Sequence, residues 1–145
     1  MNLSIEFSRK LLSAYSIACK PLCRELDLSQ TAFDILMFLG NNPRYKTASD
    51  IVEFRHIKAN LVSVNVERLV REGYLVRRRV KDDRRKTDLV CTEKAEQVVT
   101  RGRRLQKRFS ERLFANMDAD LRKAFATAID RIEENLNRAL EEEAT

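Results

Sequence analysis

The residues of this sequence best suited to bind another molecule form a dense cluster of cations. Seven of the ten residues from Arg77 to Lys86 are Arg or Lys. Clustered guanidinium and ammonium groups attract polyanions, because neutralising phosphates releases their bound counterions. A solvated face that binds nothing is the alternative for any run of charges. The position of this cluster, on a hairpin directly after two helices, favours phosphate binding.

The cluster lies on a predicted β-hairpin that follows a pair of predicted helices. Leu75 to Val80 and Thr87 to Cys91 can alternate as strands around a charged turn. A short helix over about Ala48 to Phe54 precedes them, and so does a second helix over Lys58 to Gly73 with an apolar stripe at helical spacing. The order helix, turn, helix and hairpin predicts a winged helix-turn-helix. Such a unit inserts its second helix into the major groove of DNA.

The exposed face near the start of that second helix is expected to contact the bases. It consists of Lys58, Ala59, Asn60, Leu61, Ser63 and Val64. An Asn side chain can pair with adenine, and apolar side chains such as Leu61 and Val64 can touch thymine methyl groups. We therefore expect the operator to be rich in A·T pairs where this face reads it.

The rest of the chain is predicted to be helical and to mediate dimerisation. Apolar residues recur at helical spacing from Leu3 to Leu22, so we expect a first helix of about five turns, which Pro21 should kink or end. A second, apolar helix capped by Ser29 belongs in the core. Two long helices follow the hairpin, with apolar stripes over residues 98–113 and 121–139. Since a winged helix does not need such long stripes, they are expected to bury one another across a two-fold dimer.

Length and composition fit one domain of ordinary size. The chain has 145 residues and a net charge of +6, and its predicted class is mainly α with a small β-hairpin wing (α+β). We expect a single domain over residues 1–145, with a DNA-binding region at 29–92 and dimerisation helices at 1–25 and 93–141. There is no apolar run of membrane-spanning length and no signal-peptide core, so a cytoplasmic location without a membrane partner is expected.

Two segments resemble the MarR family of bacterial transcription regulators. Residues 83–92 (DRRKTDLVCT) fit the family pattern Asp-x-Arg-x-x-x-Leu-x-Leu-Thr, with Cys91 in place of the last leucine. Residues 67–77 (ERLVREGYLVR) are similar to the family's passage from the recognition helix into the first strand of the wing. The resemblance implies a regulator of transcription that binds double-stranded DNA. It also implies a homodimeric repressor on a pseudo-palindromic operator, released by a small-molecule effector.

The resemblance also assigns roles within the wing. The family's wing-tip arginine corresponds to Arg85, which is expected to enter the minor groove, and Asp83 corresponds to the carboxylate that orients it. A guanidinium suits the negative potential of a narrow minor groove. The chain departs from the family at Val64, where an arginine is frequent, and at Leu61, where Ser or Thr is frequent. The expected DNA-binding residues of the wing are Arg77, Arg79, Lys81, Asp83, Arg84, Arg85 and Lys86.

Effector and redox sites are open hypotheses at this stage. Tyr15, Phe33 and Phe38 are candidates to line an effector pocket, but they are equally good core residues. Cys19 and Cys23 are four residues apart and share a helix face, and some relatives in the family sense peroxide through a cysteine of the first helix. A thiol-based redox-sensing regulator is therefore one alternative function. The other interpretation treats both thiols as small apolar groups at a helix contact.

An enzyme is not expected from this sequence. It has no glycine-rich phosphate loop, no nucleophile elbow and no histidine-based acid–base pair beyond its one histidine, His56. No cofactor is expected, and one histidine without ligand spacing gives no metal site. The remaining alternative is a winged-helix protein that binds RNA or protein, or that bends DNA without choosing its sequence.

Overall fold

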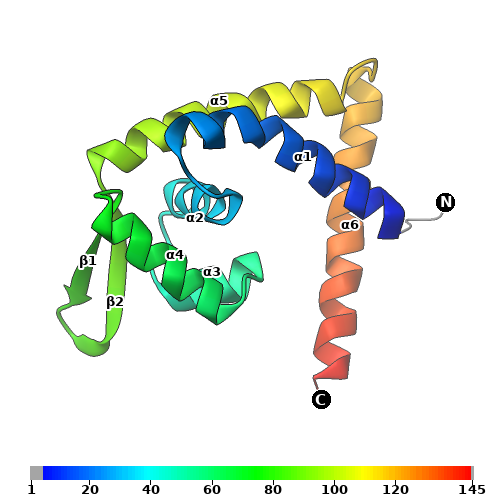
Figure 1. The fold of residues 1–145 in the computed structure, drawn as a ribbon. Helices are drawn as coiled ribbons and strands as arrows, with labels where there is room; N and C mark the ends of the chain where they lie inside the picture. Colours follow the sequence, from blue (N-terminus) through cyan, green and yellow to red (C-terminus); the bar gives the residue numbers. More distant parts are fainter. Residues whose placement is uncertain (1–4, 145) are drawn as a thin grey trace. The chain divides into compact units, whose positions relative to one another are not determined.

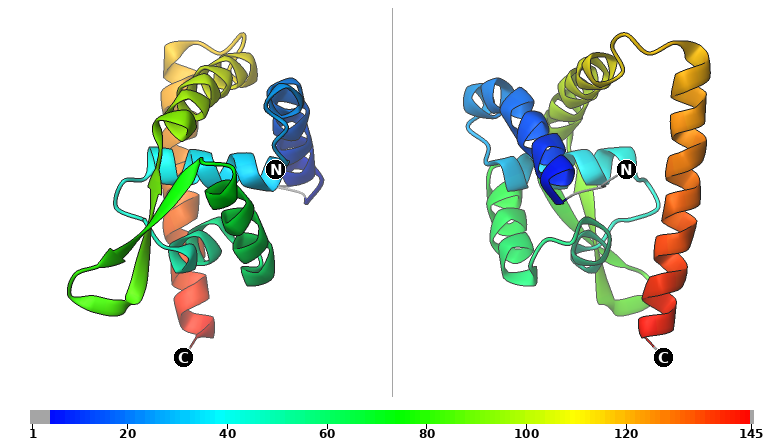
Figure 2. Two further views of the ribbon diagram at one scale, coloured as in Figure 1. Left: turned by 60° about the vertical axis from the view of Figure 1, so that its left-hand side comes forward. Right: turned by 90° about the vertical axis from the view of Figure 1, so that its right-hand side faces the viewer.

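The computed structural model describes residues 5–144, which form helices and one β-hairpin (Figure 1). The elements are α1 (Ile5–Leu26), α2 (Gln30–Asn41), α3 (Ala48–Arg55), α4 (Ala59–Arg71), β1 (Leu75–Val80), β2 (Asp83–Cys91), α5 (Glu93–Leu113) and α6 (Ala119–Glu143). The hairpin follows directly on the pair α3–α4 and extends away from α4 (Figure 2). The predicted class, mainly α with a winged helix-turn-helix, is confirmed.

The chain divides into two compact units. The first ends at Phe109 and the second begins at Ser110, within α5. The first unit contains the core, whereas none of residues 110–144 is buried. A unit without a core of its own is not a separate domain in the usual sense. The expectation of a single domain therefore stays a prediction.

Helix α1 continues beyond the proline at which it was predicted to kink or end. It includes Pro21 and runs to Leu26, so an end at the proline is wrong. A proline in a helix removes one backbone donor, and here the packing after it compensates, since Leu22 and Cys23 are both buried. The helix ends where Asp27 takes a left-handed φ of 52°.

Helix α2 is the centre of the core. As predicted, Ser29 caps it, and the Ser29 Oγ accepts a hydrogen bond from the Ala32 N–H at 3.0 Å. The helix is apolar on most sides and is enclosed by its neighbours. Its buried residues are Ala32, Phe33, Ile35, Leu36, Met37, Phe38 and Leu39.

The first part of α5 packs on α2 at two glycines. A Cβ added to Gly102 would overlap the sulfur of Met37, and one added to Gly40 would lie 2.6 Å from both γ-carbons of Val99. At each glycine the backbone of one helix therefore packs directly on a side chain of the other, and a larger residue would have to displace that side chain. This contact corrects one expectation, because Val98, Gly102 and Leu105 are buried within the chain's own core. Only the later part of the predicted stripe on α5 is available to a second copy.

Candidate nucleic-acid interface

Helix α4 exposes the face that the sequence assigns to base reading. All the residues in that prediction are exposed, namely Lys58, Ala59, Asn60, Leu61, Ser63 and Val64. The apolar ones are uncovered, since Leu61 is 45% and Val64 is 65% exposed. On the opposite side of the helix, Val62, Val66 and Leu69 are buried and fix α4 to the core. The helix therefore presents a mixed polar and apolar surface of the kind that base edges require.

Helix α3 holds the start of α4 in place. Its N-terminus is closed by a capping box, in which the Asp50 N–H donates to the Thr47 Oγ1 at 3.1 Å and the Thr47 N–H donates to the Asp50 Oδ2 at 3.0 Å. At its other end Arg55 forms an ion pair with Asp34 of α2 at 3.3 Å. His56 then adopts a left-handed φ of 53°, which ends α3 and turns the chain toward α4.

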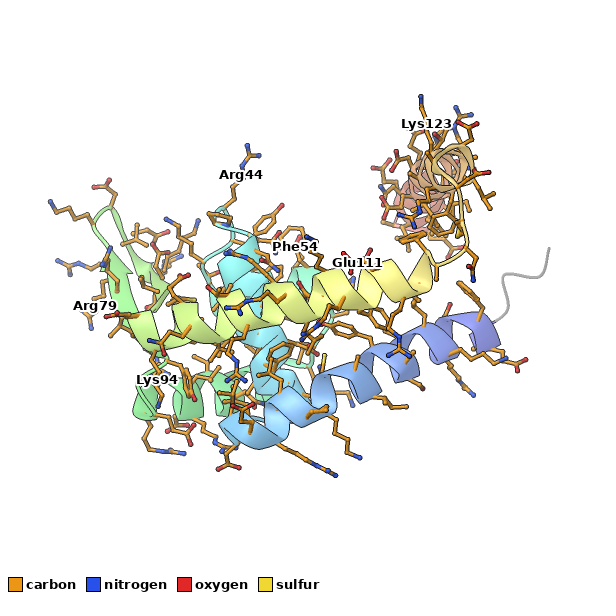
Figure 3. The ribbon with its side chains drawn as sticks, turned by 90° about the horizontal axis from the view of Figure 1, so that it is seen from above. Arg44, Phe54, Arg79, Lys94, Glu111 and Lys123 are labelled. Atoms are coloured by element: carbon orange, nitrogen blue, oxygen red, sulfur yellow. The ribbon has the colours of Figure 1, made fainter. Side chains whose placement is uncertain are left out.

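The two faces of the hairpin carry different side chains. β1 and β2 are antiparallel, with Arg77 opposite Leu89 and Arg79 opposite Thr87, so these residues share one face. Arg77, Thr87 and Leu89 line a cavity together with α3 and α4, so this face is turned toward the helix-turn-helix. Arg79 projects from the hairpin (Figure 3). Arg78, which was not among the predicted contacts, lies on the other face opposite Asp88.

The tip of the wing is a bulge held by an aspartate. Val80 pairs with Asp83 and Arg79 pairs with Thr87, so the three residues between Asp83 and Thr87 have no partner in β1. β2 therefore begins at Asp83, earlier than the predicted start at Thr87. The Asp83 Oδ1 accepts a hydrogen bond from the Arg85 N–H at 3.0 Å. The carboxylate thus fixes the backbone of Arg85 and leaves its exposed guanidinium available.

The charge of one wing lysine, Lys86, affects the pKa of Asp50 in α3. Burial raises the pKa of Asp50, but hydrogen bonds from Thr47 and Lys46 and the charge of Lys86 outweigh burial, so the pKa is lowered overall. Lys86 was assigned to DNA on sequence grounds. Its charge also favours the ionised carboxylate of the capping box, and this couples the wing to the helix beside it.

A cavity of about 470 Å³ lies between α3, α4 and the hairpin. Its lining is Ala48, Ser49, Val52, Glu53, Ala59, Val62, Ser63, Val66, Arg77, Thr87 and Leu89. Three of these residues, Ala59, Ser63 and Arg77, were predicted to contact DNA. Ser49 and Glu53 were not, although their spacing of four residues on a helix placed them on one face. The cavity therefore opens among residues that the sequence assigned to the interface.

The structure places the predicted effector residues in the core. Phe33 is fully buried, and Phe38 is buried and stacks on Tyr45 with ring centroids 5.9 Å apart. Tyr15 is half-buried, accepts a hydrogen bond from the Gln106 Nε2 at 2.9 Å, and meets Phe109 edge-on at 5.3 Å. Burial raises the pKa of Tyr15 to about 12. These contacts support the core interpretation, and an effector site at these residues stays a prediction.

The thiols are poorly suited to redox chemistry. Cys19 and Cys23 are buried and Cys91 is half-buried, and all three are free. Burial raises the pKa of Cys19, and it raises the pKa of Cys23 and of Cys91 to about 11. The thiolate is the reactive form, so such groups are nearly inert at neutral pH. A redox role for Cys19 and Cys23 stays a prediction that this geometry does not favour.

Between residues 5 and 144, no group of three or more His, Cys, Asp or Glu side chains is placed to hold a metal ion. In the same part of the chain, no helix combines the length and the apolar character needed to cross a membrane.

The fold, the exposed face of α4 and the basic hairpin define a winged helix-turn-helix protein of the DNA-binding class. Residues 26–86, which cover α2, α3, α4, β1 and the first part of β2, match the model of the MarR family. Over this segment the chain is similar to the transcription regulators of the MarR family. No curated protein is similar enough to count as a match.

Solved structures share the fold over nearly the whole chain. A putative MarR family regulator from Listeria monocytogenes, complexed with 26mer DNA, is 17% identical, with a TM-score of 0.83 over 94% of this chain and 90% of that one. A MarR regulator from Methanosarcina mazei Go1 is 20% identical, with a TM-score of 0.79 over 92% and 96%. A crystal structure of MarR is 19% identical, with a TM-score of 0.72 over 92% and 96%. At such identities these likenesses concern the fold.

Proposed function

We propose that this protein is a homodimeric repressor that binds a pseudo-palindromic operator and is released by a small ligand. The observation that carries the proposal is the exposed face of α4 next to the cationic face and tip of the hairpin. The family and fold support DNA as the partner, and a structural relative has been solved with DNA.

Base selection is proposed to come from α4 and affinity from the wing. Asn60 pairs with adenine, while Leu61 and Val64 contact thymine methyl groups, so the half-sites favour A·T pairs. Arg85 enters the minor groove, with its backbone held by Asp83. The other cations of the wing contact phosphates, which position the protein without specifying sequence.

The dimer is proposed to form through the apolar faces that this chain leaves uncovered. Helix α6 buries none of its residues. Its apolar side chains are therefore left in contact with solvent, and Leu136 and Leu140 are 56% and 69% exposed. A second copy is the occupant that we propose. α1 has four cations against Glu6 and Glu25, a net charge of +2, and residues 133–143 of α6 have five glutamates against Arg138, a net charge of −4, so the two helices are complementary in charge between copies. Two recognition helices would then read half-sites about 34–36 Å apart, or a multiple of that distance.

The ligand is proposed to act at the cavity between α3, α4 and the hairpin. A small organic anion there would pair with Arg77 and occupy the space beside Ser63. Both residues also belong to the proposed DNA interface, so ligand and operator would compete. The alternative site at Tyr15, Phe33 and Phe38 would require repacking of the core.

Selection of sites from random duplex DNA tests the function. We expect an inverted repeat with A·T-rich half-sites, bound as one dimer per repeat. Mobility shifts with that duplex, a random duplex and a structured RNA then separate the alternatives. A clear preference for the selected duplex at physiological salt supports the regulator. Equal binding to all duplexes would indicate a non-specific DNA-bending protein, and a preference for RNA would overturn the proposal.

A further inference from the structure

Helix α4 has a third face, distinct from its buried face and from its DNA-facing residues. Asn65, Arg68 and Glu72 follow one another at helical spacing along this face and are each half-buried. The Arg68 Nε donates to the Glu72 Oε1 at 2.9 Å, an interaction within one helix that fixes the direction of the guanidinium. This arrangement leaves the rest of the guanidinium aimed away from α4.

The guanidinium of Arg68 contacts the corner between α1 and α2. The Arg68 Nη2 donates to the backbone carbonyl of Asp27 at 3.1 Å. The Asp27 carboxylate lies farther away, at 3.8 Å, and is fully exposed, so it contributes little. A second contact joins the same two regions, since the Ser29 Oγ donates to the Asn65 Oδ1 at 3.2 Å.

The corner itself has one defined backbone geometry. The Leu28 N–H donates to the Cys23 carbonyl at 2.9 Å and the Asp27 N–H donates to the Arg24 carbonyl at 3.2 Å. This is the hydrogen-bond pattern of a Schellman motif, with Asp27 in the left-handed conformation usually taken by glycine. Leu28 is buried, which anchors the corner to the core. The carbonyl of Asp27 is therefore a fixed point against which Arg68 can position α4.

We propose that Arg68 is a positioning residue for DNA reading: it braces α4 against the α1–α2 corner and so sets the angle at which Asn60 and Ser63 meet the bases. This inference rests on the proposed function. Because the guanidinium is engaged by Glu72 and Asp27, Arg68 does not contact phosphate. Its loss changes discrimination between sequences rather than general affinity for DNA.

The test compares Arg68→Lys with Asp27→Gly in the full-length protein. Lysine keeps the charge but lacks the planar fork that joins Glu72 to the Asp27 carbonyl. Coupling through such a residue amounts to about two- to thirtyfold in affinity. We therefore expect Arg68→Lys to lower the ratio of operator to random-duplex affinity by that factor. The salt slope and the affinity for random duplex should stay unchanged.

Asp27→Gly is the matched control. Glycine keeps the left-handed conformation and the carbonyl that accepts the hydrogen bond, and it removes only the exposed carboxylate. The affinity ratio should then stay within about twofold of the wild-type value. Thermal unfolding shows whether each variant is folded. If Arg68→Lys does not fold, Glu72→Gln weakens the same brace and must also lower the ratio.

The outcomes separate this inference from the proposed function. Wild-type protein that shows no preferred duplex contradicts the function itself. A wild-type preference that Arg68→Lys leaves unchanged overturns the brace. An equal loss of affinity for operator and for random duplex, with a salt slope smaller by about one, would show that Arg68 contacts phosphate. That result would also overturn the positioning role of Arg68.

Discussion

Helices α2 and α6 use their apolar residues in opposite ways. α2 has 12 residues and buries seven of them, whereas α6 has 25 residues and buries none. Both carry apolar residues at helical spacing, but α2 is apolar on most sides and α6 has a single apolar stripe, which is why the sequence predicted that α2 lies in the core. The difference is that α2 is enclosed by the chain itself, while α6, α4 and the wing have exposed faces, which we propose contact a second copy or DNA. Substitutions in the two kinds of region should therefore disturb different properties.

The largest effect is expected where α5 crosses α2. Gly102→Leu inserts a side chain where even a Cβ would overlap Met37. Overpacking of this kind costs on the order of 3 kcal/mol. We expect the midpoint of urea unfolding to fall sharply.

The control for that variant lies two residues away on the same helix. Thr100→Leu adds a similar side chain at an exposed position, so the free energy of unfolding should change by about 0.5 kcal/mol or less. Equal stability of the two variants would contradict the close contact between α2 and α5.

The next effect concerns α6. Replacing both Leu136 and Leu140 by Glu removes exposed apolar surface from the proposed dimer contact. We expect the dissociation constant of the dimer to rise at least about tenfold, because each buried leucine contributes about 1.5–3 kcal/mol. Sedimentation equilibrium measures this dissociation constant. Asn137→Glu, which adds charge on the flank of the helix, is the control and should change the constant much less.

A smaller effect is expected at the wing. Arg85→Ala should weaken binding to every duplex and lower the salt slope by about one, because one cation at the DNA surface is lost. Arg78→Ala removes the same charge from the other face of the hairpin. It should change the slope less when affinity is titrated against salt. Identical slopes for the two variants would argue against an inserted wing tip.

The smallest effect is expected at Asp34. Burial raises the pKa of this carboxyl, and Gln30 and Arg55 only partly offset burial. Ionised Asp34 therefore lowers stability above its folded pKa, and the loss disappears as the pH falls toward the unfolded value of 3.8. We expect Asp34→Asn to raise the free energy of unfolding at pH 7 by on the order of 1 kcal/mol or less, which a higher melting temperature would report. The gain should vanish near pH 4.

Glu25→Gln is the comparison, because its effect on stability should depend on pH in the opposite direction. The hydrogen bond and charge of Arg101 lower the pKa of Glu25. Its contribution to stability is present above the unfolded pKa and is lost as the pH falls through the folded value. Parallel pH trends for the two variants would contradict the assignment at Asp34.

Local signals predicted most of the helices and which face of α4 is exposed. The Ser29 cap, the Thr47–Asp50 box and the stripe of α4 act within a few residues, so the sequence displays them. The continuation of α1 through Pro21 depends on packing against α2, which no local pattern reveals. The same limit applies to the contact of Arg68 with Asp27, since the partners are 41 residues apart and one of them is a backbone carbonyl.

The bulge at the wing tip also affects whether the hairpins of different molecules aggregate in the absence of DNA. In the described part of the chain the sheet has two strands, so β1 has an open edge and Val76 is half exposed on one face. Open edges invite strand-to-strand aggregation. A bulge that interrupts the ladder, and cations along β1, oppose such pairing. The charges that we propose attract DNA thereby also keep the hairpins of different molecules apart.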